Sequence, residues 1–223
     1  MKAMILAAGR GSRMGNLTEN TPKPLTKIGN ATLIEHNIKR LKSSGIIDIC
    51  INVSYLGYKI KNHLKNGSHL GVNIKYFDES KKMLGTGGGI LNALSFLGKN
   101  PFWLVNADLF SDFIIPSQKK LKNNVKGHLI LVKNPDHNPG GDFDLIDDKV
   151  SFYEGDKPLT YSGMSLLSPK LFSSINKKIF PLEPILEKNA FNGSLSGEYF
   201  TGNWCDVGTK ERLDSIQELI KYK

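Results

Sequence analysis

Apolar residues in the first half of the chain gather in short continuous runs, which are separated by segments with a helical spacing of apolar residues. The runs are typical of buried strands and cover 3–7, 46–53, 72–77 and 102–105. Between them, apolar residues recur every three or four positions, as on one face of a helix, over 33–41, 56–64 and 85–97. This alternation predicts an α/β fold with a parallel sheet and right-handed crossovers.

The pattern in the second half is less regular. An apolar run predicts a strand at 128–132, and antiparallel strands are expected at 142–146, 150–153 and 159–167. Helices are expected at 171–174, 182–188 and 211–220, with a short strand at 204–207. Because no repeat, low-complexity linker or clear boundary interrupts the chain, we expect a single domain over 1–223.

The composition is that of a globular protein with an excess of basic residues. The chain has 223 residues, of which 39% are hydrophobic and 23% charged. Its formal net charge of +9 favours an anionic partner, either a nucleic acid or a phosphorylated small molecule. The lysines are scattered, however, as they would be on a solvated surface, and no RRM, KH or helix-turn-helix signature is present. We therefore expect no nucleic-acid partner.

Apolar run lengths and cysteine usage bear on the location of the protein. No apolar run reaches the roughly 18 residues needed to span a bilayer, and the run at 3–8 is too short for the core of a signal peptide. Cys50 and Cys205 lie far apart without a CxxC pair, which argues against a disulfide framework or a structural zinc site. We expect a cytoplasmic protein without a membrane partner, as a monomer or a small homo-oligomer.

A glycine-rich stretch, LAAGRGSRM at 6–14, follows the first expected strand. Glycines allow backbone N–H groups to approach a phosphate closely. The P-loop pattern is absent, and Met14 stands where a dinucleotide fingerprint requires its third glycine. Two interpretations remain: an ordinary strand-to-helix turn, or a basic phosphate-binding loop in which Arg13 acts as a bidentate clamp.

Lys23 supports the second interpretation. It lies between Pro22 and Pro24, ten residues after Arg13. Because proline restricts the backbone on both sides, the lysine projects from a stiff segment and is suited to the charge of a triphosphate. We expect Arg13 and Lys23 to belong to one phosphate site.

Two aspartates occupy positions where ligands bind in α/β folds. Asp108 follows the fourth expected strand, and Asp206 precedes the last helix. Ligands of open α/β sheets bind beyond the carboxyl ends of the strands, and two carboxylates there can hold Mg²⁺ together with substrate phosphates. The alternative is that Asp108 is a turn residue and Asp206 an acid at the approach to a helix.

The motifs LAAGRGSRM at 6–14 and TPKPL at 21–25 resemble the signature of the sugar-phosphate nucleotidyltransferases, also called nucleotide-sugar pyrophosphorylases. The resemblance extends from end to end. It implies a Rossmann-like three-layer αβα fold with a mostly parallel, mixed central sheet and a smaller sugar-binding β subregion. It also implies a nucleotide-binding half over about 1–110, and a sugar-binding half with the closing helix over about 111–223.

The same resemblance implies roles for individual residues. The catalytic set is Arg13, Lys23, Asp108 and Asp206, with the two aspartates holding Mg²⁺. The implied contacts of the nucleoside triphosphate are Leu6, Ala7, Ala8, Gly9, Gly11, Ser12, Arg13, Lys23, Met83, Gly87 and Gly88, the two glycines lying in a stretch similar to one that lines the base pocket. The implied sugar contacts are Asn106, Asp142, Ser162, Gly163 and Asp206.

The sugar is suggested by further motifs. GDFDL at 141–145, YSGMSLLSP at 161–169 and WCDVGT at 204–209 are most similar to those of family members that join UTP to N-acetylmuramate 1-phosphate in peptidoglycan recycling. The implied substrates are therefore UTP and a sugar 1-phosphate. Members that form GDP-mannose, dTDP-glucose or UDP-glucose are the alternatives. Residues 79–85 depart from the pattern of the close relatives, which often have an acidic residue before the threonine of this stretch. The departure affects the expected contacts to the base.

Overall fold

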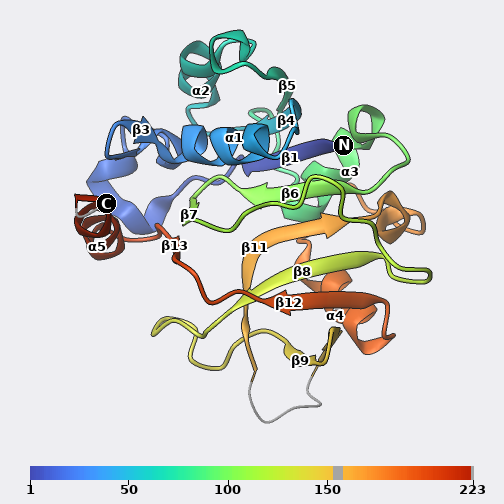
Figure 1. Ribbon diagram of the computed structural model, residues 1–223. Helices are drawn as coiled ribbons and strands as arrows, with labels where there is room; N and C mark the ends of the chain where they lie inside the picture. The colour runs from blue at the N-terminus through green and yellow to red at the C-terminus, as the bar shows by residue number, and fades with distance from the viewer. Residues whose placement is uncertain (153–157, 222–223) are drawn as a thin grey trace.

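A large mixed sheet forms the centre of the computed structural model, which describes residues 1–152 and 158–221 and also contains two small two-stranded sheets. Its nine strands follow the order β5-β4-β1-β6-β11-β8-β12-β10-β9 (Figure 1). Four of them form the parallel part: β1 (Lys2–Ala7), β4 (Asp48–Val53), β5 (Asn73–Asp78) and β6 (Phe102–Asn106). The predicted parallel half is confirmed.

Three helices connect these parallel strands, as predicted: α1 (Leu33–Ser43), α2 (Gly57–Leu64) and α3 (Gly85–Leu97). The start of α1 is defined by a capping box, in which the Thr32 hydroxyl accepts from the backbone N–H of Glu35 and the Glu35 carboxylate accepts from Thr32. None of the helices within 1–152 and 158–221 has the length and apolar character needed to cross a membrane.

The second half extends the sheet with strands of both directions. β11 (Thr160–Leu167) is antiparallel to β6 and to β8 (Gly127–Val132), and β12 (Leu195–Tyr199) is parallel to β8. β10 (Lys149–Ser151) and β9 (Asp144–Ile146) complete the edge. The remaining elements are β2 (Lys27–Ile28), β3 (Ala31–Thr32), β7 (Leu109–Ser111), β13 (Trp204–Asp206), α4 (Glu183–Phe191), α5 (Lys210–Lys221) and the 3₁₀ turns η1 (Ser12–Thr18), η2 (Lys23–Leu25), η3 (Ser68–Leu70) and η4 (Pro169–Phe172).

The sequence prediction differs from the structure in several places, among them the unpredicted strands β2, β3 and β7. The helix expected at 171–174 is the 3₁₀ turn η4, which begins at Pro169. The strand expected at 150–153 ends at Ser151, and residue 153 lies outside the described residues. Strand β12 was not predicted, because its sequence LSGEY contains a glycine and a glutamate, and its place depends on pairing with β8.

Side chains of each parallel strand alternate between two hydrophobic clusters, one on either side of the sheet. Ala3 and Ile5 of β1 pack with α1 and α2 in one cluster, whereas Met4 packs with α3 and α4 in the other. Ile38 and Ile90 are fully buried representatives of the two helix layers. The molecule is therefore a three-layer αβα structure, as expected.

Candidate active site

A cavity of about 370 Å³ lies at the carboxyl ends of β1, β4 and β6. This is the position at which open α/β sheets bind ligands. Nine residues predicted to contact the nucleotide line it: Leu6, Ala7, Ala8, Gly9, Gly11, Ser12, Arg13, Lys23 and Met83. We call this space the nucleotide cavity.

Gly11 joins the glycine-rich loop to Lys23. Its φ of +69° is in the left-handed region, and a Cβ there would lie 3.0 Å from Lys23 Cβ. The hydroxyl of Thr18 donates to the carbonyl oxygen of Gly11 at 3.0 Å and holds the loop in place. The structure thus brings the loop and Lys23 together, as the sequence indicated.

Lys23 is buried, and its ammonium group makes an ion pair with Asp108. Nζ lies 2.5 Å from Oδ2 of Asp108, whose side chain is 30% exposed. The rigid turn η2 presents the lysine, with Pro22 before it and Pro24 within it. The phosphate-binding and metal-binding candidates therefore adjoin one another.

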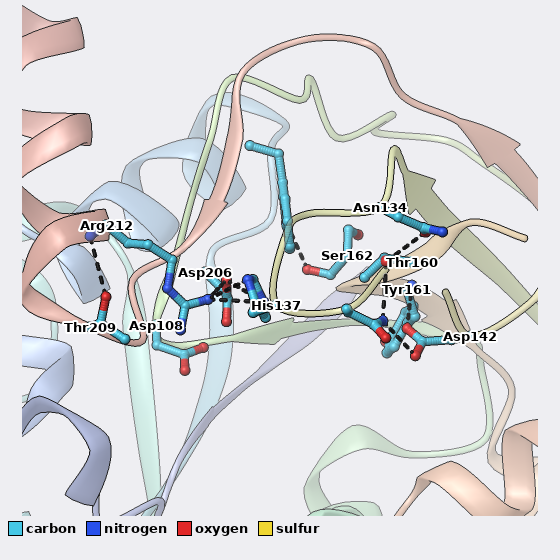
Figure 2. Close-up of polar contacts among 12 residues, drawn as sticks. Asp108, Asn134, His137, Asp142, Thr160, Tyr161, Ser162, Asp206, Thr209 and Arg212 are labelled. Carbon is cyan, nitrogen blue, oxygen red and sulfur yellow. Dashed lines mark hydrogen bonds and ion pairs between the residues drawn. The ribbon is translucent and has the colours of Figure 1, made fainter. Parts of the chain in front are cut away.

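Asp108 and Asp206 lie next to each other on two paired segments. β7 and β13 are antiparallel, Asp206 is opposite Leu109, and the N–H of Val207 donates to the carbonyl oxygen of Asp108 at 2.9 Å. Figure 2 shows both carboxylates in one group of polar side chains. Oδ1 of Asp206 accepts from Nη1 of Arg212 and lies 3.3 Å from Nε2 of His137.

Helix α1 holds β7 in place. Asn37 donates to the carbonyl oxygen of Leu109 at 3.0 Å, and Arg40 donates to that of Ser111 at 3.3 Å. Burial lowers the pKa of Arg40 to about 10, partly offset by the charge of Asp112. Asp112 in turn accepts from the backbone and side chain of Asn203, at 2.8 and 2.6 Å. These contacts set the spacing of the strands that carry the two aspartates.

The two carboxylates fit a magnesium ion that completes its shell with substrate oxygens. Mg²⁺ is commonly held by one or two carboxylates together with waters and phosphates. No group of three or more His, Cys, Asp or Glu side chains suited to a metal occurs in the part of the chain that the structure describes. An ion at Asp108 and Asp206 would compete with Lys23 and Arg212 for these carboxylates.

Cys205 lies beside this group without the properties of a nucleophile. Burial, together with the neighbouring charge of Asp206, raises the pKa of its thiol to about 11. The thiol is therefore protonated at neutral pH.

A second cavity, also of about 370 Å³, adjoins the first and shares Leu6, Thr86 and Asn106 with it. We call it the sugar cavity, because Asn106 and Asp142, two predicted sugar contacts, line it. Oδ1 of Asp142 accepts from the side chain of Asn138 at 2.9 Å. Oδ2 of Asp142 accepts from the N–H of Tyr161 at 2.8 Å (Figure 2). These two hydrogen bonds fix the orientation of the Asp142 carboxyl group.

Gly87 and Gly88 are not among the residues that line either cavity, and their expected contact with the base stays a prediction. Their N–H groups both donate to the carbonyl oxygen of Phe180 at 3.1 Å. A Cβ on Gly87 would lie 2.3 Å from the Phe180 ring, and one on Gly88 2.4 Å from the carbonyl oxygen of Lys178. These glycines let α3 pack closely on the 178–181 segment, while Gly85 and Thr86 line the nucleotide cavity.

Ser162 and Gly163 are likewise absent from the lining of both cavities. They lie where the pairing of β11 with β8 shifts register, between Tyr161 and Ser165. The carbonyl oxygen of Ser162 accepts from Nε1 of Trp204 at 2.9 Å. A Cβ on Gly163 would lie 2.6 Å from Nδ2 of Asn106. Ser162 thus helps to position β13 through Trp204, and Gly163 helps to position Asn106.

The sequence analysis missed a buried pair, Asn52 and Glu79, which line the nucleotide cavity. Asn52 accepts from the N–H of Ala7 at 2.9 Å and donates to Oε1 of Glu79 at 2.8 Å. Oε2 of Glu79 accepts from the N–H of Leu84 at 3.1 Å. This chain of bonds joins the ends of β1, β4 and β5 to the start of α3. The sequence signal that could have revealed this pair is Asn52, a polar residue within the apolar run 46–53.

Comparison with known proteins identifies the class. The chain belongs to the nucleotidyl transferase family, whose model matches residues 2–139.

Individual relatives give more detail. The chain is 42% identical to N-acetylmuramate alpha-1-phosphate uridylyltransferase of Neisseria meningitidis, over 98% of both chains. It is 30% identical to the protein of the same name from Caulobacter vibrioides, over 92% of this chain and 91% of that relative. It is also 30% identical to D-glycero-alpha-D-manno-heptose 1-phosphate guanylyltransferase of Campylobacter jejuni, over 95% of this chain and 96% of that relative. The crystal structure of HddC from Yersinia pseudotuberculosis shares the fold, with a TM-score of 0.80 at 23% identity over 100% and 99% of the chains.

Proposed function

We propose that this enzyme condenses UTP with N-acetylmuramate 1-phosphate to UDP-N-acetylmuramate and pyrophosphate, as a step of peptidoglycan recycling. The observation that carries the proposal is the 42% identity to the Neisseria uridylyltransferase over 98% of both chains. Two adjoining cavities that share Asn106 support it, because the two substrates must meet at the α-phosphorus. Residues 1–110 would serve the nucleotide, and 111–223 mainly the sugar.

The reaction requires little proton transfer from the protein. A phosphate monoester has a second pKa of about 6, so a sugar 1-phosphate is largely a dianion at neutral pH and attacks without a dedicated base. The enzyme must instead offset the repulsion between two polyanions and the charge of an in-line transition state. Arg13 and Lys23 line the nucleotide cavity and are the cations assigned to this task.

Asp108 and Asp206 would hold the Mg²⁺ ion on which this chemistry depends. When bound, the ion supplies positive charge to the phosphate oxygens of the substrates. Lys23, 2.5 Å from Asp108, would lie beside one of the two proposed metal ligands.

The nucleotide cavity would take the uracil base near the start of α3. Gly85 and Thr86 line this part, and Glu79 holds Leu84 by its N–H at 3.1 Å. A rigid glycine-containing backbone allows close approach to the edge of a small pyrimidine. A cytoplasmic location also belongs to the proposal, because the free thiols of Cys50 and Cys205 are typical of a reducing compartment.

A guanylyltransferase acting on another sugar 1-phosphate is the second candidate. It is favoured by the 30% identity to the Campylobacter heptose enzyme over 95% of this chain.

A substrate panel distinguishes the two. The purified enzyme is incubated with Mg²⁺, four nucleoside triphosphates and equimolar sugar 1-phosphates, and the products are identified by mass. We expect UDP-N-acetylmuramate to dominate, and the Asp108→Asn variant to form almost none. A dominant UDP-glucose or UDP-N-acetylglucosamine would contradict the assigned sugar, and a GDP-sugar would favour the second candidate.

A further inference from the structure

The sugar cavity is lined by acidic side chains. Four carboxylates line it, and no Lys, Arg or His appears among its described lining residues; the four are Asp142, Asp144, Glu183 and Glu187. Carboxylates are good acceptors for sugar hydroxyl groups but repel another carboxylate. A substrate that carries its own carboxylate must therefore direct that group away from these four residues.

Arg212 and His137 form a group of basic side chains that is separate from the residues lining the two cavities. Arg212 is near the start of α5, and its Nη1 lies 3.1 and 2.9 Å from the two ring nitrogens of His137 (Figure 2). His137 belongs to the 133–141 loop, which also supplies Gly140 and Gly141 to the sugar cavity. The pair thus joins the loop of the sugar cavity to the closing helix.

Arg212 also reaches the edge of the nucleotide cavity. A Cβ on Gly208 would lie 2.1 Å from Nη2 of Arg212, and Gly208 lines that cavity. A guanidinium group has five N–H donors, and among the described residues Arg212 uses only Nη1 for side-chain contacts, to His137 and Asp206. The side chains of Arg212 and His137 are 19% and 36% exposed, so a ligand can approach both.

Resting on the proposed function, we propose that Arg212 and His137 bind the lactyl carboxylate of N-acetylmuramate 1-phosphate and thereby select this sugar. Arginine binds a carboxylate through two parallel N–H bonds, and Nε with Nη2 forms such a fork. The imidazole of His137 supplies a further donor beside it. The acidic lining of the sugar cavity takes the hydroxyl groups of the same sugar.

The test compares two substrates that differ only at this group. One is N-acetylmuramate 1-phosphate, and the other is its analogue with a carboxamide in place of the lactyl carboxylate. We expect Arg212→Gln to lower kcat/KM for the acid by about tenfold or more while changing that for the amide by about twofold or less. His137→Gln should change the ratio of the two values in the same direction. Lys210→Gln, which removes an exposed charge two positions earlier on α5, should leave the ratio unchanged.

Arg212 also contacts Asp206, so Mn²⁺ binding to each variant is measured by calorimetry. An equal loss of kcat/KM for the acid and the amide, with or without weaker Mn²⁺ binding, would overturn the proposal. An unchanged kcat/KM for both substrates would also overturn it. If Arg212→Gln does not fold, Arg212→Lys retains the charge but not the fork and should still lower the acid-to-amide ratio. The proposed function is tested separately, since wild-type enzyme that forms no UDP-sugar from either substrate would contradict it.

Discussion

The ammonium group of Lys23 lies 2.5 Å from a carboxylate oxygen of Asp108, although the two residues are 85 positions apart in the sequence. This ion pair joins the loop after β1 to the turn after β6. Any change at one residue therefore alters the charge that the other presents to a substrate.

Replacing either metal-binding candidate should remove most of the activity. Asp108→Asn and Asp206→Asn each delete one carboxylate of the adjacent pair, of which Asp108 lines the nucleotide cavity. We expect Mg²⁺-dependent turnover to fall on the order of 100-fold or more, because the charge of the transition state is no longer balanced. Pyrophosphate release measures the effect, and circular dichroism checks the fold. Wild-type rates in both variants would refute the metal assignment.

Lys23→Ala and Arg13→Ala should act on the triphosphate. Lys23 is buried and its loss leaves Asp108 without its cation, so turnover should fall and UTP binding should weaken more than sugar 1-phosphate binding. Lys27→Ala, an exposed lysine four positions later, serves as the matched control and should behave as wild type. The measurement is a separate KM value for UTP and for the sugar 1-phosphate in each variant. A change confined to the KM of the sugar 1-phosphate would contradict the assigned roles.

Two glycines should respond differently to alanine. In Gly87→Ala the new Cβ would lie 2.3 Å from the Phe180 ring and 3.0 Å from the carbonyl oxygen of Pro181. Overpacking of this kind costs about 1–3 kcal/mol, so Tm should fall by several degrees. Gly9→Ala meets no atom within 4 Å and should keep its Tm. The new methyl group in Gly9→Ala should nevertheless weaken UTP binding at the nucleotide cavity. Equal melting temperatures for Gly87→Ala and Gly9→Ala would argue against the packing role of Gly87.

The Asn52–Glu79 pair should stabilise the fold as well as shape the nucleotide cavity. Asn52→Ala leaves the N–H of Ala7 and Oε1 of Glu79 without their bonds in a buried position. An unsatisfied buried group costs about 1–3 kcal/mol, which predicts a Tm lowered by roughly 2–10 °C. Asn73→Ala, which removes an exposed bond to Asp48, is the control and should change Tm little. Thermal denaturation of the two variants makes the comparison.

Stability should depend on Glu198 at acid pH. The imidazole of His128, whose Nε2 lies 3.4 Å from Oε1 of Glu198, and the ammonium group of Lys119 at 3.0 Å lower the pKa of Glu198 from 4.5 to about 2, against the opposing effect of burial. Because the pKa is lower in the folded state, this stabilisation is present above about pH 4.5 and is lost as the pH falls towards 2. Glu198→Gln should flatten the fall of Tm over this interval, whereas Glu218→Gln on the exposed face of α5 should not. Parallel Tm profiles for wild type and Glu198→Gln would contradict the assignment.

Local sequence patterns determined the parallel half of the fold and the first part of the site. The apolar runs identified β1, β4, β5 and β6, and the predicted bounds of α3 agree with the structure. Arg13 and Lys23 lie only ten residues apart in the sequence, so their spacing was sufficient to predict one site, and both line the nucleotide cavity. Periodicity and turn chemistry act over a few residues, and the sequence displays them directly.

The tertiary structure alone decided which distant residues meet. Sheet order places β12 beside β8, and the pairing of β7 with β13 brings Asp206 next to Asp108. The same long-range packing places Gly87 against the Phe180 ring. It also joins Arg212 to His137 across 75 positions. Such contacts depend on strand order and register over the whole sheet, and no local pattern of residues encodes them.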